Sequence, residues 1–148
     1  MDIKHQIIKA TFFMSAACVA ICILMACSMK ESSEAEERAK IFAINYFNLK
    51  YNQAAKLATD EAKKWIEYRA ANITQDDLDV LDSQPDTATC EINGFDSDGD
   101  SGTVKVTIKN FLLVDSIGKT GKMCGERDYA IRMKRVGETW LVDIDKPV

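Results

Sequence analysis

Apolar and polar side chains alternate with a period of two through the second half of the chain. The alternation occurs in four stretches, over residues 87–95, 103–115, 123–136 and 139–145. In the second stretch, Val104, Val106 and Ile108 take every other position. Because successive side chains of a β-strand point to opposite faces, this pattern predicts strands with one face on a core and one in water. Turns with glycine separate the stretches, so we expect a four-stranded antiparallel sheet.

The first half, over residues 33–82, is instead rich in Ala, Glu and Lys, and apolar residues recur there at helical spacing. Ser33 followed by Glu36 predicts a capped helix that runs to about Lys50. Its expected buried face consists of Ala35, Ala39, Phe42, Tyr46 and Leu49. We expect three shorter helices after it: one over residues 53–57, one capped by Thr59 or Asp60, and one capped by Thr74 with Asp77. Helices that precede an antiparallel sheet indicate an α+β fold, with Pro85 between the two halves.

The N-terminus has the features of a secretory signal. Lys4 and Lys9 precede an apolar stretch over residues 10–26, which is short for a membrane-spanning helix, although an uncleaved anchor remains the alternative. The stretch ends in Leu24-Met25-Ala26-Cys27, which resembles the lipobox of bacterial lipoproteins. We therefore expect a signal peptide over residues 1–26, a lipidated tether over 27–33 that begins at Cys27, and a single domain over 34–148.

Charge and composition exclude several classes of function. Removal of residues 1–26 takes away Lys4, Lys9 and Asp2, so the net charge of −4 becomes −5. An acidic chain without a basic patch is not expected to bind nucleic acid. The single histidine, His5, lies in the predicted signal peptide, so catalysis through an imidazole and zinc binding through histidine are not expected. We expect no cofactor.

Several segments together resemble the nuclear transport factor two-like, or cystatin-like, superfamily. They are Ala39, Phe42 and Tyr46, the junction over residues 51–55, and the phrase over residues 135–143, which contains Gly137-Glu138-Thr139-Trp140. More narrowly, the chain resembles small bacterial lipoproteins of unknown function that carry such a domain. The acidic run Glu31, Glu34, Glu36 and Glu37 resembles surface-export signals of the Bacteroides group, although acids at the start of a helix also favour its dipole.

The resemblance implies a sheet that curves around the long helix as a cone. In such proteins the mouth of the cone is an enzyme pocket, a ligand site or a surface for a partner or second copy. The enzymes use His/Asp or Asp/Tyr pairs, of which only the second is open to this chain. Asp128 and Tyr129 are adjacent in a predicted strand, so we expect them to point to opposite faces.

The sequence contains three candidate sites. The alternation of apolar and polar residues is lost over residues 111–114, so both faces of that strand end are apolar. Phe111 and Leu113, together with Tyr129 and Trp65, could therefore line the mouth of the cone or an interface. Aromatic residues of this kind are more often part of the core. A second candidate is a calcium site of Asp96, Asp98 and Asp100, for which an acidic hairpin tip is the simpler interpretation. The third is a disulfide between Cys90 and Cys124, against which the expected strand register argues.

Taken together, these patterns favour a lipid-anchored, non-enzymatic binding or interaction module in the bacterial cell envelope. The expected location is the outer membrane, and the sequence does not distinguish its periplasmic face from its surface face. Besides the membrane that holds its lipid, its partner would be an envelope protein or a small ligand. The alternatives are a small Asp/Tyr acid–base enzyme of the isomerase or dehydratase type, and a structural partner in an envelope complex without any pocket.

Overall fold

The computed structural model of this protein describes residues 29–30, 32–116 and 118–148. Residues Glu34–Val148 form one compact unit. The predicted signal peptide, the lipidation site at Cys27 and Glu31 of the acidic run lie outside the described residues. Within the described part of the chain, no helix is both long enough and apolar enough to cross a membrane.

The compact unit begins with a helix that covers residues 34–47. Its buried face has the predicted helical spacing, and its members are 5% exposed or less: Ala35, Ala39, Phe42, Ala43, Tyr46 and Phe47. Two details of the prediction were wrong. Residues 32 and 33 are already helical, so Ser33 is not the cap. The helix ends three residues earlier than expected, so Leu49 follows it with a φ of +58° and is partly buried outside the helix.

Three shorter helices follow: α2 (Tyr51–Ala55), α3 (Asp60–Ala71) and α4 (Gln75–Asp82). The caps lie where the sequence predicts them. The Thr59 side chain accepts a hydrogen bond from the backbone N–H of Ala62, and Thr74 forms a reciprocal capping box with Asp77. These caps satisfy backbone donors that the first turn of a helix leaves unpaired, so they set where α3 and α4 begin.

The second half of the chain forms a four-stranded antiparallel sheet in the order β1-β2-β3-β4. The strands are β1 (Thr89–Asp98), β2 (Ser101–Leu113), β3 (Lys122–Val136) and β4 (Thr139–Val142). Gly99 and Gly137 occupy the first and last turns with φ values of +59° and +65°, a conformation that glycine adopts without strain. The α+β class expected from the sequence is therefore confirmed.

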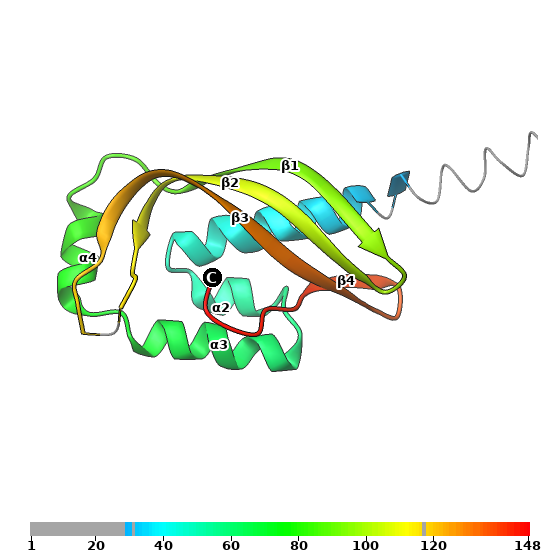
Figure 1. Cartoon of the computed structure of the whole chain (residues 1–148). Helices are drawn as coiled ribbons and strands as arrows, with labels where there is room; N and C mark the ends of the chain where they lie inside the picture. Colours follow the sequence, from blue (N-terminus) through cyan, green and yellow to red (C-terminus); the bar gives the residue numbers. More distant parts are fainter. Residues whose placement is uncertain (1–28, 31, 117) are drawn as a thin grey trace, which may run out of the picture. The chain divides into compact units, whose positions relative to one another are not determined.

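The N-terminal helix packs on the inner face of the sheet, which curves over it (Figure 1). As predicted, the apolar sets of β2, β3 and β4 point inward and form the core with the helix. Trp140 is 1% exposed, and its ring meets Phe95 edge-on at a centroid distance of 5.3 Å. Its backbone oxygen accepts a hydrogen bond from Arg38 of the helix. The Gly-x-x-Trp phrase therefore joins the last strand to the first helix.

The segment between α2 and α3 covers the outer edge of β4. Val142 donates its N–H to the oxygen of Leu57 at 2.8 Å, and Thr59 donates to the oxygen of Val142 at 2.9 Å. The last strand is shorter than predicted: β4 ends at Val142, and after one further backbone hydrogen bond, from the Asp143 N–H to the Arg132 oxygen, the chain leaves β3. Residues 143–148 then return beneath the sheet toward its interior, as the red segment of Figure 1 shows. We call this segment the tail.

Candidate functional site

The deepest part of the concave side is an aromatic cluster. Phe47 of the N-terminal helix lies 4.9 Å from Phe111 of β2 and 4.9 Å from Tyr129 of β3, measured between ring centroids. Tyr46 and Tyr51 continue the cluster, with their ring centroids 5.4 Å apart. The fold thus brings two of the four predicted pocket residues, Phe111 and Tyr129, into contact with each other.

A small cavity lies beside this cluster. Phe111, Leu113 and Tyr129 line it together with residues of the N-terminal helix, α2, α3 and the tail. Its volume of about 20 Å³ is room for roughly one water molecule and is far below that of a small-molecule site. In this structure the cone is therefore filled by its own side chains and by the tail.

Trp65, the fourth predicted pocket residue, does not line this cavity. Ala62 and Ile66 form the buried side of α3, whereas Trp65 is 38% exposed and lies edge-on to Tyr68 at 6.2 Å. Its position on the helix falls at the margin of the buried side. The cavity instead includes Arg69, one helical turn after Trp65.

Arg69 hydrogen-bonds both the tail and the segment that follows β2. Its guanidinium donates to the oxygen of Val114 at 2.9 Å and to the oxygen of Val148 at 3.2 Å. The N–H of Val148 in turn donates to the Tyr46 hydroxyl at 3.1 Å. The sequence analysis did not identify Arg69 as a site residue, although an arginine on the same helical side as Ala62 and Ile66 was a signal that could have found it.

A larger groove runs between the tail and β3. β4 pairs with β3 only from Met133 to Val136. On this edge, the earlier part of β3 therefore borders the tail instead of a paired strand. The groove has a volume of about 640 Å³ and opens to solvent. Its lining residues are Thr103, Arg127, Tyr129, Ala130, Arg132, Ile144, Asp145, Lys146, Pro147 and Val148.

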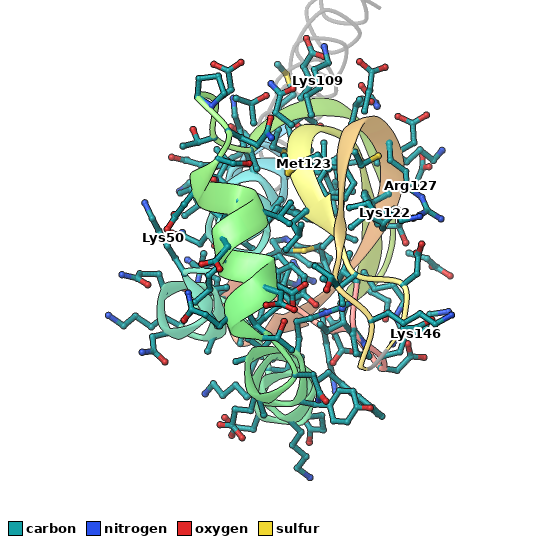
Figure 2. All side chains as sticks on the ribbon, turned by 90° about the vertical axis from the view of Figure 1, so that its left-hand side faces the viewer. Lys50, Lys109, Lys122, Met123, Arg127 and Lys146 are labelled. Atoms are coloured by element: carbon teal, nitrogen blue, oxygen red, sulfur yellow. The ribbon has the colours of Figure 1, made fainter. Side chains whose placement is uncertain are left out.

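Cationic side chains are concentrated along this groove. The Arg127 guanidinium carbon lies 5.7 Å from the centre of the Tyr129 ring. Arg132 donates to the oxygen of Asp143 at 3.1 Å and pairs with the Asp145 carboxylate at 3.0 Å, so part of its charge is neutralised. Figure 2 shows Arg127 and Lys146 projecting on the same side of the domain, with Lys50 on the opposite side. The groove lining thus has three cationic side chains against one acidic side chain, Asp145, in a chain of net negative charge.

Two tyrosines of the cavity, Tyr51 and Tyr129, hold their protons more tightly than a free phenol does. Burial raises the pKa of Tyr129 to about 12, and the nearby Arg127 offsets only part of that effect. Burial also raises the pKa of Tyr51, and its neighbour Tyr46 adds to the rise. Both phenols are therefore protonated at neutral pH, and the site offers hydroxyl groups, guanidinium groups and aromatic faces rather than a general base.

Asp128 does not join this site. The hydroxyl of Thr107 donates to the Asp128 carboxylate on the outer face of the sheet, and the amide of Asn93 donates to the same hydroxyl at 2.8 Å. Tyr129, the next residue, faces Phe47 and Phe111 on the inner side. The structure therefore separates the one Asp/Tyr pair that the sequence analysis considered for acid–base chemistry.

Two of the three aspartates of the calcium candidate are paired with cations. Asp96 pairs with Lys105 at 2.7 Å across the first hairpin, and Asp100 pairs with Arg135 of β3 at 2.9 Å. Asp98 is the last residue of β1. In the described part of the chain, no group of three acidic, cysteine or histidine side chains is placed to hold a metal ion.

Cys90 and Cys124 are free thiols. Cys90 pairs in register with Ile108 and Cys124 with Phe111, on opposite sides of β2. Two strand spacings separate them by roughly 9–10 Å before the three-residue offset along β2 is added, which is too far for a disulfide. The offset is smaller than the sequence predicts, and Cys124 packs against the core. The β2–β3 register is the same on both sides of Asn110, where Lys109 pairs with Glu126 and Phe111 with Cys124. Asn110 has a φ of +55°, and at this residue the inward side of β2 changes, so that Phe111 and Cys124 both face the core.

No protein-family model matches the sequence, and no curated protein matches it significantly. Among solved structures, the fold is similar to that of a provisionally named NTF2-like transpeptidase from Campylobacter jejuni. The identity is 13% and the TM-score 0.48, over 74% of this chain and 96% of the other. An uncharacterized cystatin-fold protein from Novosphingobium aromaticivorans is similar at 13% identity and a TM-score of 0.44, with the same coverage. At such identities the likeness concerns the fold alone.

Proposed function

We propose that this protein is a lipid-anchored binding module of the bacterial cell envelope, without catalysis, that holds a segment of a partner protein on the concave side of its domain. The observation that carries the proposal is the contrast between the two hollows of that side. The inner cavity of about 20 Å³ has no room for a small molecule, whereas the groove beside β3 measures about 640 Å³ and is open.

The lining of the groove favours a protein partner with acidic residues. Tyr129 supplies an aromatic floor, and Arg127 and Lys146 supply positive charge at its rim. Aromatic and arginine side chains contribute much of the binding energy at protein interfaces. Opposite charge on a partner would speed its association, while the acidic remainder of the domain would repel it elsewhere. The alternative of an Asp/Tyr enzyme has less support, because Asp128 and Tyr129 point to opposite faces.

The envelope location rests on Leu24-Met25-Ala26-Cys27 after an apolar leader. Mass spectrometry of the membrane-extracted protein should find a chain that starts at Cys27 and carries acyl groups. A Cys27→Ser variant, exported by a substitute signal, is the control and should be released as a soluble protein without high salt, because the mature chain has a net negative charge. An unmodified Cys27, or a chain that keeps Met1, would contradict the proposal.

The groove itself is tested by affinity capture from intact, cross-linked cells with two matched charge reversals. Arg127→Glu changes the groove, and Lys64→Glu makes the same change on the exposed outer side of α3. We expect the recovered amount of a co-purifying envelope protein to fall at least tenfold with Arg127→Glu and to stay unchanged with Lys64→Glu. Equal recovery with both variants would mean that the groove is not the binding surface.

A further inference from the structure

The tail lies at the centre of the concave side and divides it. Val148 lines both the small inner cavity and the large groove, and Pro147 lines the groove and a third hollow of about 210 Å³ between α3 and the end of β2. Other residues are also shared: Tyr129 borders the inner cavity and the groove, and Arg69 borders the inner cavity and the third hollow. The three hollows are therefore parts of one concavity, which Pro147 and Val148 partition.

Val148 is held in the way that a binding site holds a peptide. The Tyr46 hydroxyl accepts its N–H at 3.1 Å and the Arg69 guanidinium donates to its oxygen at 3.2 Å. Its side chain lies against the buried aromatic core. Both polar contacts go to backbone groups, which every extended peptide carries, and the apolar contact selects a small aliphatic side chain.

The tail is only weakly attached between Ile144 and Val148. The Asp143 N–H donates to the oxygen of Arg132 at 2.9 Å, and Ile144 is 8% exposed, so the tail is fixed up to this point. Asp145 and Lys146 are exposed, and Pro147 has no N–H with which to pair with a strand. The ion pair between Arg132 and Asp145 joins two side chains that are at least half exposed, a kind of pair that contributes little.

We propose that residues 146–148 are a displaceable internal ligand, and that the site beneath them binds an extended peptide segment with a small aliphatic side chain. This inference rests on the proposed function, because it assigns the partner segment to the same concave side and adds its regulation. A partner must compete with the tail, so its apparent affinity is reduced by the fraction of time that the tail occupies the site. Once the tail is displaced, the three hollows join and the partner can reach Arg69 and Tyr46.

The test uses the mature, detergent-solubilised chain and a labelled peptide of residues 143–148, Asp-Ile-Asp-Lys-Pro-Val. A Val148→Asp variant places a charge against the apolar core and should expel the tail. Lys64→Gln changes the net charge by the same one unit at an exposed position of α3 that lines none of the three hollows, so it is the matched control. Fluorescence anisotropy should show the peptide binding at least tenfold tighter to Val148→Asp than to the wild type or to Lys64→Gln. A peptide that ends in Asp in place of Val should not bind.

Adding Tyr46→Phe to the Val148→Asp variant removes only the hydroxyl that accepts the amide, and should weaken peptide binding without unfolding the domain. If Val148→Asp keeps the circular dichroism of the wild type but binds the peptide no better, the proposal is overturned. If that variant does not fold, hydrogen exchange on the wild type decides: the Val148 amide should exchange at least 100-fold faster than the Val142 amide, and equal protection would overturn the proposal. The capture experiment with Arg127→Glu is independent, so either proposal can fail alone.

Discussion

At the scale of single residues, Asp77 shows how one buried carboxylate joins two distant segments. It has no exposed surface, and its oxygens accept from the Thr74 N–H at 2.8 Å, the Thr74 hydroxyl at 2.9 Å and the Gly121 N–H at 2.7 Å. The capping box was predictable from Thr74 and Asp77 alone. The contact with Gly121 was not, because the two residues are 44 positions apart and only the folded chain brings them together.

We predict that Asp77→Asn lowers the free energy of unfolding by about 1–3 kcal/mol, since its amide nitrogen would face donors and leave at least one buried N–H unpaired. Urea denaturation measures the change. Asp82→Asn, at an exposed position of the same helix, should leave the stability nearly unaltered. A loss of equal size in both variants would show that the buried contacts of Asp77 have no special role.

The same carboxylate makes stability depend on pH. Burial by itself raises the pKa of Asp77, but the hydrogen bonds from Gly121 and Thr74 outweigh it and hold the pKa below its ordinary value of 3.8. A carboxylate whose pKa is lowered by folding stabilises the folded state at every pH above its pKa in the unfolded chain. This contribution is lost as the pH falls through its pKa in the folded protein. The wild type should therefore lose more stability than Asp77→Asn between pH 5 and the folded pKa of Asp77, and parallel curves would contradict this.

Trp140 carries a second prediction at this scale. Truncation of a fully buried tryptophan to alanine leaves a large cavity, so Trp140→Ala should cost about 3–5 kcal/mol. Trp65→Ala is the matched control, because Trp65 is 38% exposed and should lose far less. Among the described residues, the indole N–H of Trp140 has no hydrogen-bond partner, so Trp140→Phe should cost clearly less than Trp140→Ala. Thermal unfolding of the three variants measures the loss of stability in each, and we expect it to be largest for Trp140→Ala.

At the scale of elements, the sequence predicts the existence and order of the helices and strands better than their ends. The first hairpin has the expected register, because Asp98-Gly99 sets the turn and Cys90 meets Ile108. The side of the sheet on which Cys124 lies was not predictable, since the alternation of inward residues in β2 changes at a left-handed Asn110 in the middle of the strand. Residues 32 and 33 are already helical, so the first helix does not begin at the Ser33 cap that the sequence predicts.

The register leads to a prediction about the two thiols. Cys124 is partly exposed, whereas Cys90 is 8% exposed and burial raises its pKa to about 11, although Lys40 acts in the opposite direction. Because the thiolate is the reactive form, titration of the native domain with a thiol reagent at neutral pH should modify Cys124 and leave Cys90 intact until the protein unfolds. A Cys124→Ser variant should then show no rapid reaction. Protein purified from an oxidising compartment with no free thiol would contradict the observed register.

At the scale of the whole molecule, the fold could be predicted from patterns along the chain, but the site could not. Phe111, Leu113 and Tyr129 were identified because they break or extend a visible alternation, and they do line the inner cavity. The groove depends on the shortness of β4, which ends at Val142, and on the path that the tail takes afterwards. Arg127, Arg132 and Lys146 come from distant parts of the sequence, so no local pattern marks them as one surface.

The most direct test of the account is photo-cross-linking in living cells, with the lipidated protein at its natural location. A photoreactive amino acid is placed at position 127, in the groove, and in a second strain at position 64, on the outer side of α3. The account predicts one discrete cross-linked envelope protein from position 127 and none from position 64. The same product from both positions, or none from position 127 while the protein is folded and lipidated, would contradict the claim that this domain binds its partner through the groove.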